Sequence, residues 1–274
     1  MKPAMLILLL LLPGLVAPAA EPARPAGALA EAWQALANNR PDLALPQFER
    51  LAAQGRADPR SVRFGTALSL LAQPTDLPNR VARARVLLAA LAADGTDDVA
   101  LGARFQLARL AEFQADPPDP VQAAKIFRQL IAEQPASAWA QAALPRLAVL
   151  LLYTPAGPAD PAKRVAAAEP LLGSARQPAV AVELHLIIAD AIFHYRLPDA
   201  GALPHLLAAG QSAGLDAATR GDVLVQIGEL LRLAGDPARA ARYYRAFLAE
   251  YPRDARQYAV HQRLAGQGGA RPAP

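Results

Sequence analysis

The sequence predicts an all-α fold, an α-solenoid or superhelix of stacked helix–turn–helix repeats. The chain has 274 residues, of which 53% are hydrophobic and only 5% aromatic, and alanine and leucine dominate the apolar residues. This composition is typical of helices that pack closely on small side chains. One small and two large apolar residues, spaced as in a helix, recur along the chain. No segment shows the strict alternation or the β-branched enrichment of a strand.

The recurring pattern is an alanine, a large apolar residue four positions later, and another three positions after that. Offsets of four and seven residues place all three side chains on one face of a helix. The clearest copies are Ala44/Phe48/Leu51, Ala123/Phe127/Leu130 and Ala240/Tyr244/Phe247; weaker ones are Ala84/Leu88/Leu91 and Ala202/Leu206/Ala209, and a degenerate one is Ala168/Leu172. Neighbouring alanines lie 40, 39 and 38 residues apart in the pairs 44–84, 84–123 and 202–240. Such a period predicts a repeated helical hairpin.

Further helices are expected between these marked ones. Their apolar periodicity places them at 28–38, 60–72, 98–114, 137–153, 179–195 and 217–234, with a last helix at 254–265. One hairpin cannot cover its own apolar face, so successive hairpins should stack on a continuous core. Asp236 and Pro237 form an N-cap and first-turn pair that should begin a helix. Pro145 should kink or split the helix that contains it.

The first 19 residues are typical of a signal peptide. Lys2 supplies a positive charge, an apolar stretch follows, and Ala17-Pro18-Ala19 has the small residues of a processing site. The alternative is a leader retained as a membrane anchor. Its apolar stretch is shorter than the ~20 residues that span a bilayer, and Pro13-Gly14 interrupts it. We therefore expect export to the periplasm or the outer membrane, with no integral membrane segment after cleavage.

The expected domain organisation follows from these segments. It is a signal peptide at 1–19, a flexible linker at 20–27, a helical repeat domain at 28–265 and a disordered tail at 266–274. The chain has no cysteine, so an exported protein of this sequence must rely on its apolar core and not on disulfides.

One segment resembles a known family. Residues 221–252, GDVLVQIGELLRLAGDPARAARYYRAFLAEYP, resemble the tetratricopeptide repeat, a helix–turn–helix unit with small residues at fixed places and a closing proline. If Pro252 is that proline, the signature positions are occupied by Leu224, Ile227, Gly228, Leu231, Ala240 and Tyr244. Phe247 departs from the usual small residue. The looser pattern extends over most of the chain.

The resemblance implies a protein–protein interaction scaffold and not an enzyme. In the family, the first helix of each pair lines a concave face where an extended peptide or a partner helix docks. Carried over to this chain, the groove residues would be Glu229 and Arg232 in the best-matching repeat, and Arg109 and Glu112 in the unit at 104–135. Two alternatives remain open: these charges are merely solvated, or the protein is a structural module with no groove ligand.

A hydrolase is the alternative function, either a serine hydrolase or a cell-wall enzyme with a helical platform. Residues 210–214 read Gly-Gln-Ser-Ala-Gly, the G-x-S-x-G of a nucleophile elbow, and Asp222 and His261 follow in the hydrolase order. An elbow needs a strand that enters the turn. The segment before Gly210 is an alanine-rich helix, so we interpret Ser212 as a linker serine.

No metal, cofactor or nucleic-acid site is expected. None of the four histidines has another histidine three or four positions away, and no glycine-rich phosphate loop is present. Asp190 and His194 share a helix face, but we interpret them as a polar pair, or His194 as a histidine that interacts with the dipole at the helix C-terminus. A further alternative is that His194-Tyr195 forms part of a binding surface. The net charge of +4 is a weak field for nucleic acid. Trp33 and Trp139 lie on apolar helix faces, where packing explains them.

Overall fold

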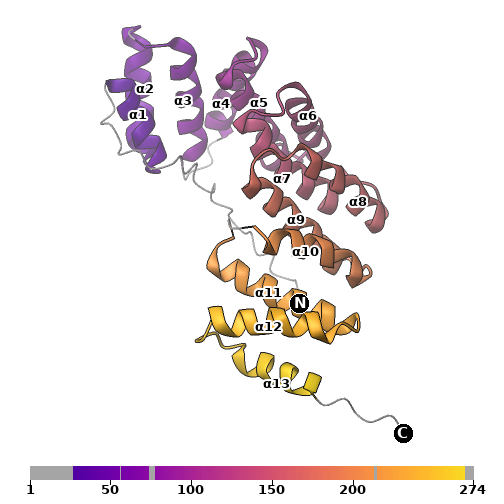
Figure 1. The fold of residues 1–274 in the computed structure, drawn as a ribbon. Helices are drawn as coiled ribbons and strands as arrows, with labels where there is room; N and C mark the ends of the chain where they lie inside the picture. The colour runs from indigo at the N-terminus through magenta and orange to yellow at the C-terminus, as the bar shows by residue number, and fades with distance from the viewer. Residues whose placement is uncertain (1–26, 56, 74–77, 213–214, 269–274) are drawn as a thin grey trace, which may run out of the picture. The chain divides into compact units, whose positions relative to one another are not determined.

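The computed structural model describes residues 27–55, 57–73, 78–212 and 215–268 (Figure 1). These ranges contain α-helices and short 3-10 segments and no strand, which confirms the all-α prediction. The expected signal peptide, most of the linker and residues 269–274 lie outside the described residues. Within the described part of the chain, no helix combines the length and apolarity needed to cross a membrane.

The chain forms two compact units, residues 1–80 and 81–274. The first contains α1 (Ala28–Ala37), α2 (Pro41–Gln54) and α3 (Pro59–Ala72), and α4 (Pro78–Ala93) begins at its end. The second continues with α5 (Asp98–Phe113), α6 (Pro120–Glu133), α7 (Ala138–Tyr153), α8 (Pro161–Ala168), η1 (Glu169–Ser174), α9 (Pro178–His194), η2 (Asp199–Gly201), α10 (Ala202–Gly210), α11 (Ala217–Leu233), α12 (Pro237–Glu250) and α13 (Gln257–Gly268).

The first unit is a small bundle in which α1, α2 and α3 contact one another. Phe48 of α2 is fully buried, and its ring lies edge-on to Trp33 at a centroid distance of 5.1 Å. Trp33 therefore packs against the buried apolar residues of this unit, as predicted. A Cβ atom at Gly65 of α3 would overlap the Phe48 ring, so the absence of a side chain there lets α2 and α3 approach closely.

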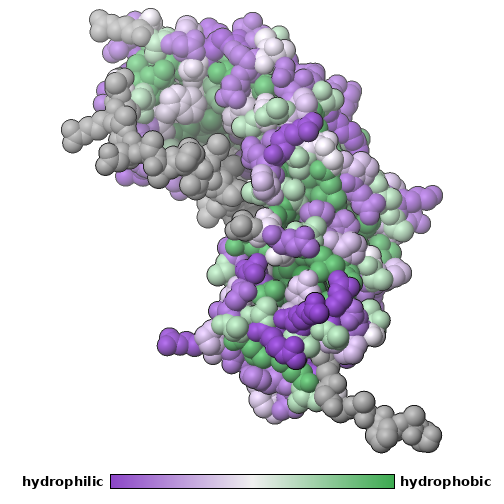
Figure 2. Space-filling view, viewed as in Figure 1, coloured by the Kyte–Doolittle hydropathy of each residue, from purple (hydrophilic) through white to green (hydrophobic). Residues whose placement is uncertain are grey.

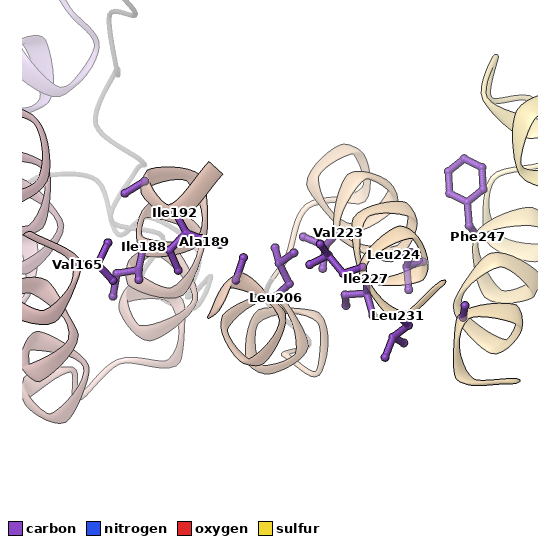
Figure 3. Close-up of a cluster of buried hydrophobic side chains, with 14 of the residues drawn as sticks. Val165, Ile188, Ala189, Ile192, Leu206, Val223, Leu224, Ile227, Leu231 and Phe247 are labelled. Atoms are coloured by element: carbon purple, nitrogen blue, oxygen red, sulfur yellow. The ribbon is translucent and has the colours of Figure 1, made fainter. Parts of the chain in front are cut away.

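The second unit is built from consecutive helices that pack in pairs, α5 with α6, α7 with α8, α9 with α10 and α11 with α12 (Figure 1). Each pair also contacts the next, because α6 and α9 contact α7 and α10 contacts α11. Figure 3 shows the resulting layers of buried side chains, from Val165 through Ile188, Leu206 and Val223 to Phe247. Buried side chains from Leu101 to Leu184 form a second cluster, and the partly buried Leu172 and Ile187 pack against both clusters, so successive hairpins of this unit share apolar contacts as predicted.

The alanines of the recurring pattern are contact points between helices, as predicted. All of them are fully buried: Ala44, Ala84, Ala123, Ala168, Ala202 and Ala240. Within the α11–α12 hairpin, a Cβ atom at Gly228 would come within 2.5 Å of the Tyr244 ring. Small residues therefore set the close approach of the helices, and the large residues beside them fill the remaining space.

Most helix starts are fixed by a capping side chain, often followed by proline. Asp236 Oδ1 accepts a hydrogen bond of 3.0 Å from the Arg239 amide, and Pro237 occupies the first turn, as the sequence predicts. The same arrangement of aspartate and proline begins α3, α6 and α8. These caps satisfy amide groups that have no partner within the helix.

One predicted helix start differs from the structure, and one of the two outcomes predicted for Pro145 is excluded. Pro145 does not split its helix, because α7 continues from Ala138 to Tyr153 and buries Pro145 among its contacts with neighbouring helices. This packing outweighs the cost of about 3 kcal/mol for proline inside a helix. The last helix begins at Gln257 and not at 254, because Asp254 accepts hydrogen bonds from the backbone and side chain of Arg256.

The surface carries large apolar side chains on several separate helices. Figure 2 shows such residues in green between polar ones in purple. The exposed examples are Leu43, Val86, Phe113, Val121, Leu233 and Tyr258. Isolated exposed apolar residues are ordinary, so only those that lie beside other unusual groups point to a function.

Candidate functional site

The predicted groove residues of α5 lie on a surface formed by three helices of the second unit. Helices α5, α7 and α9 are the first helices of successive hairpins, and α7 contacts both α5 and α9. We call the surface that carries Arg109, Glu112, Arg146 and Glu183 the first-helix face. Two of these charged residues come from α5, one from α7 and one from α9.

The charges of the first-helix face are half-buried and incompletely paired. The Glu112 side chain is only 9% exposed, and its Oε1 atom lies 3.9 Å from Arg146 Nη1. Arg109 Nε and Glu112 Oε2 are buried and have no hydrogen-bond partner in the described part of the chain. Buried polar atoms without partners cost about 1–3 kcal/mol each, so they are uncommon in native structures.

Burial also shifts the titration of these groups. It raises the pKa of the Glu112 carboxyl, and the nearby charges of Arg146 and Arg109 oppose the shift. The pKa of Glu183 is raised for the same reason, again against the effect of Arg146. Burial lowers the pKa of Arg109. The face therefore holds two acids, Glu112 and Glu183, and one base, Arg109, whose charged forms are poorly solvated.

An exposed aromatic ring borders these charges. Phe113, the last residue of α5, is 56% exposed, and the Arg146 guanidinium lies over its ring at 5.7 Å from the centroid. A cation held at this distance interacts favourably with the face of the ring. The first-helix face thus combines an accessible apolar ring with charged groups that lack full pairing.

The other predicted groove pair, Glu229 and Arg232, is fully engaged within the protein. Glu229 Oε1 accepts a hydrogen bond of 2.7 Å from the Tyr244 hydroxyl, and Oε2 lies 3.0 Å from Arg232 Nη2. Arg263 of α13 pairs with the same carboxylate. Burial and the hydrogen bond to Glu229 raise the pKa of Tyr244. Glu229 therefore links α11 to α12 and α13.

Asp190 and His194 do not form the polar pair considered from the sequence. Asp190 Oδ2 accepts a hydrogen bond of 2.9 Å from the Tyr153 hydroxyl. His194, the last residue of α9, instead lies edge-on to Tyr153 and Tyr195, at centroid distances of 5.3 and 4.8 Å. Among the residues that the structure describes, no three His, Cys, Asp or Glu side chains are grouped so as to hold a metal ion.

A histidine pair was missed by the sequence interpretation. His185 of α9 and His205 of α10 bring their Nδ1 atoms to 3.0 Å. The search for histidines three or four positions apart covers a single helix, whereas this contact crosses a hairpin. His205 is buried, and its Nε2 atom lies 3.8 Å from Glu169 Oε1. Burial lowers the pKa of both imidazoles.

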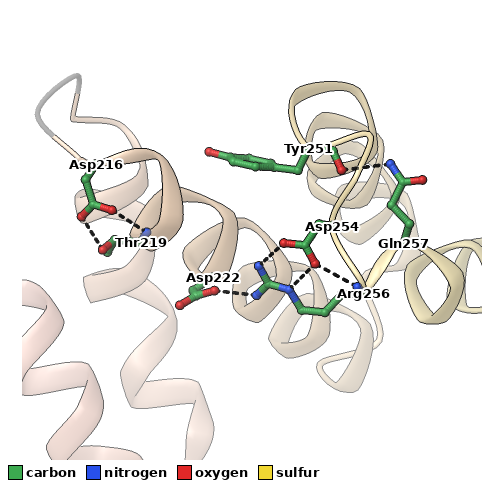
Figure 4. Close-up of polar contacts among 7 residues, drawn as sticks. All are labelled: Asp216, Thr219, Asp222, Tyr251, Asp254, Arg256 and Gln257. Atoms are coloured by element: carbon green, nitrogen blue, oxygen red, sulfur yellow. Dashed lines mark hydrogen bonds and ion pairs between the residues drawn. The ribbon is translucent and has the colours of Figure 1, made fainter.

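The structure gives Ser212 no nucleophile elbow. Helix α10, and not a strand, enters Gly210, and the Ser212 amide donates a hydrogen bond of 3.1 Å to the Ala209 carbonyl. Residues 213 and 214 lie outside the described residues. Asp222 Oδ1 is 2.5 Å from Arg256 Nη1 (Figure 4), and His261 is exposed on α13. The helical entry removes the sharp strand-to-helix bend on which the chemistry depends.

The contacts of Asp222 belong to a polar cluster that attaches the last helix. Arg256 also pairs with Asp254 at 2.8 Å, and Gln257 Nε2 donates a hydrogen bond of 3.0 Å to the Tyr251 carbonyl (Figure 4). These bonds lie just before α13 and connect it to α11 and to the end of α12. They account for Asp222 without a catalytic role.

Comparison with known families gives one match. Residues 222–254 match the family model described as Tetratricopeptide repeat. The matched segment covers most of α11 and all of α12, the hairpin in which Gly228 faces Tyr244. A comparison with curated protein sequences gives no match to the chain. The α11–α12 hairpin is therefore similar to a tetratricopeptide repeat, and it lies within an all-α array of helical hairpins.

Proposed function

We propose that the protein is an exported scaffold of the cell envelope that binds an extended peptide or a partner helix on the first-helix face. The tetratricopeptide repeat and the helical fold support the broader role, a protein–protein interaction scaffold. The leader-like residues 1–19 support the location, in the periplasm or at the outer membrane. In the family, the corresponding first helices line the groove that holds a partner.

The incompletely paired charges beside Phe113 carry this proposal. Packing between hairpins does not require charged residues at Arg109, Glu112, Arg146 and Glu183, because apolar side chains of similar size stabilise such positions at least as well. A bound chain can offer backbone amides or charged side chains to these groups once they reorient. It can also cover the exposed ring of Phe113. Glu229 is not available to a bound chain in this way, because Tyr244, Arg232 and Arg263 already pair with its carboxylate.

Two matched variants of the processed chain test the proposal. Phe113→Ala removes the ring from the first-helix face, whereas Val121→Ala shortens an apolar side chain of equal exposure, 56%, on α6. Each variant is expressed in its native cells, crosslinked in the envelope and captured. A partner of the first-helix face should be lost with Phe113→Ala and kept with Val121→Ala. Equal capture by both variants would rule out this face as the site.

Localisation is tested separately by fractionation of the same cells. The processed chain should appear in the periplasmic or outer-membrane fraction. Recovery of the full-length chain from the cytoplasm alone would contradict the envelope role and leave the scaffold role standing.

A further inference from the structure

A surface pocket lies beside α8, and none of its lining residues belongs to the charged residues of the first-helix face. The pocket has a volume of about 260 Å³. It is formed by α8, the start of η1, the end of α9, and the segment through η2. Apart from Glu169, its lining residues are apolar or small: Ala162, Val165, Ile192, Leu197, Pro198 and Gly201. Val165 and Ile192 are buried residues of the cluster in Figure 3, and they form the inner wall of the pocket.

Glu169 is the one charged residue of this lining, and its charge is poorly matched within the protein. Its side chain is 51% exposed, and its ion-pair partner in the described part of the chain is His205. The distance of 3.8 Å from Glu169 Oε1 to His205 Nε2 is too long for a hydrogen bond. The carboxylate is therefore accessible from the pocket and retains its capacity to accept hydrogen bonds.

His205 does not neutralise this carboxylate at neutral pH. Burial lowers the pKa of His205, although the charge of Glu169 opposes this shift, and His185 Nδ1 lies 3.0 Å from His205 Nδ1. A neutral His205 that directs Nε2–H toward Glu169 must use Nδ1 to accept a hydrogen bond from His185 Nδ1–H. The histidine pair is thus held in place by its own hydrogen bond, and within the part of the chain that the structure describes the Glu169 carboxylate has no permanently charged partner.

We propose that this pocket binds a lysine side chain of a protein partner. The four methylenes of the lysine would pack against Val165 and Ile192, and its ammonium group would donate hydrogen bonds to Glu169. Lysine combines an apolar stem with a compact, strongly hydrated charge, which matches apolar walls that carry one half-exposed carboxylate. The source of the lysine rests on the scaffold function proposed above, whereas the chemistry of the pocket does not.

The size and position of the pocket agree with a side chain that remains attached to a larger molecule. Its volume lies below the ~300–1,000 Å³ of pockets that enclose drug-sized ligands. Pro198 and Gly201 are exposed at its edge, so the chain that carries the lysine can stay outside. The net negative charge of the lining favours a cation over a carboxylate or a neutral chain.

The chemistry can be tested with Nα-acetyl-lysine N-methylamide as the probe. The full processed chain, labelled at isoleucine δ1 methyl groups, should show a saturable NMR shift of the Ile192 methyl signal. Nα-acetyl-norleucine N-methylamide, which has a similar stem without the charge, should bind at least about fivefold more weakly, and Glu169→Gln should weaken lysine binding to a similar degree. Equal binding of both probes, or no shift with either, would overturn the proposal.

Two glycines supply a steric test with a matched control. A Cβ atom at Gly201 would contact Ile192 Cδ1 at 3.6 Å, so Gly201→Val places its methyl groups in the pocket. A Cβ atom at Gly173, in η1, would meet no atom within 4 Å. Gly201→Val should abolish the probe-induced shift, and Gly173→Val should preserve it. If Gly201→Val does not fold, Glu169→Lys provides the second test, because it reverses the charge at a half-exposed position.

The outcomes separate this site from the first-helix face. Phe113→Ala should leave binding of the lysine probe unchanged, since Phe113 is not among the lining residues. Binding of n-pentylamine without binding of the lysine derivative would overturn the lysine assignment, because the pocket would then admit a free amine only. If the lysine probe binds and Phe113→Ala still captures the partner, the first-helix face is rejected as a binding site and the pocket is retained.

Discussion

The Nδ1 atoms of His185 and His205 lie 3.0 Å apart across the α9–α10 hairpin. At this distance one imidazole must donate and the other must accept, so the contact requires that at least one ring is neutral. Burial disfavours the protonated form of both rings, and the proximity of His205 lowers the pKa of His185 further. The pair therefore makes the folded state sensitive to acid.

The histidine pair predicts a loss of stability in mild acid. The folded-state pKa values lie below the unfolded value of 6.5, so the unfolded chain binds more protons as the pH falls through this value. The free energy of unfolding should decrease from about pH 7 down to the folded pKa values, by on the order of 1 kcal/mol or less because both rings are partly solvated. Urea unfolding at several pH values measures this slope.

His185→Gln is the variant for that experiment, because glutamine keeps a hydrogen-bonding side chain and does not titrate. Its slope between pH 7 and pH 5 should be shallower than that of the unmodified chain. His261→Gln, on an exposed part of α13, is the control and should keep the full slope. Parallel slopes in all three proteins would show that the pair does not govern acid stability.

Glu229 and Tyr244 predict a stability effect within the tetratricopeptide repeat. Tyr244→Phe removes the hydroxyl that donates to Glu229 and keeps the buried ring, so the free energy of unfolding should fall by about 1–2 kcal/mol. Tyr258→Phe, at a highly exposed position of α13, should change it by less than about 0.5 kcal/mol. Denaturant unfolding of the three proteins gives the comparison, and equal midpoints would contradict a stabilising role for this bond.

Gly228 predicts how closely α11 and α12 must approach. Gly228→Ala places a methyl group within 2.5 Å of the Tyr244 ring, so the variant should lose about 1–3 kcal/mol despite the higher helix propensity of alanine. Gly266→Ala, where an added Cβ meets nothing within 4 Å, should be unchanged or slightly more stable. Thermal unfolding followed by circular dichroism distinguishes them. A Gly228→Ala variant as stable as Gly266→Ala would show that the helices separate without cost.

The leader-like residues 1–19 predict a defined N-terminus if the protein is exported. If cleavage follows Ala19, mass spectrometry of the envelope fraction should find a chain that begins at Ala20. Ala19→Arg should block processing, because the site requires a small residue, whereas Ala23→Arg should not. A full-length chain in the envelope for all forms would instead support a retained anchor.

The helices and their packing residues could be predicted because their signals are local. The alanine of each copy and the large residue four positions later lie on one helix face by geometry alone, and Asp236-Pro237 marks a helix start without reference to the rest of the chain. Pro145 shows where this approach fails. Its helix-breaking tendency is local, but the burial that overrides it comes from neighbouring helices.

The candidate sites depend on relationships that the sequence does not display. Position within a repeat predicts both Arg109 and Glu229 as groove residues, but the contact from Arg263 that engages Glu229 comes from α13. The His185–His205 contact and the pocket around Glu169 depend on the register of α9 against α10 and on the path through η2. Neither quantity is encoded in a spacing of three or four residues.

The arginines around the last helix limit how freely these hairpins can be exchanged. Arg256 pairs with Asp222, and Arg263 adds a second cation to Glu229, which already pairs with Arg232, so both acids of α11 have an ion-pair partner outside their own hairpin. A hairpin transplanted into the place of α13 would need complementary cations as well as a matching apolar surface. The attachment of α13 therefore depends on specific ion pairs as well as on apolar packing.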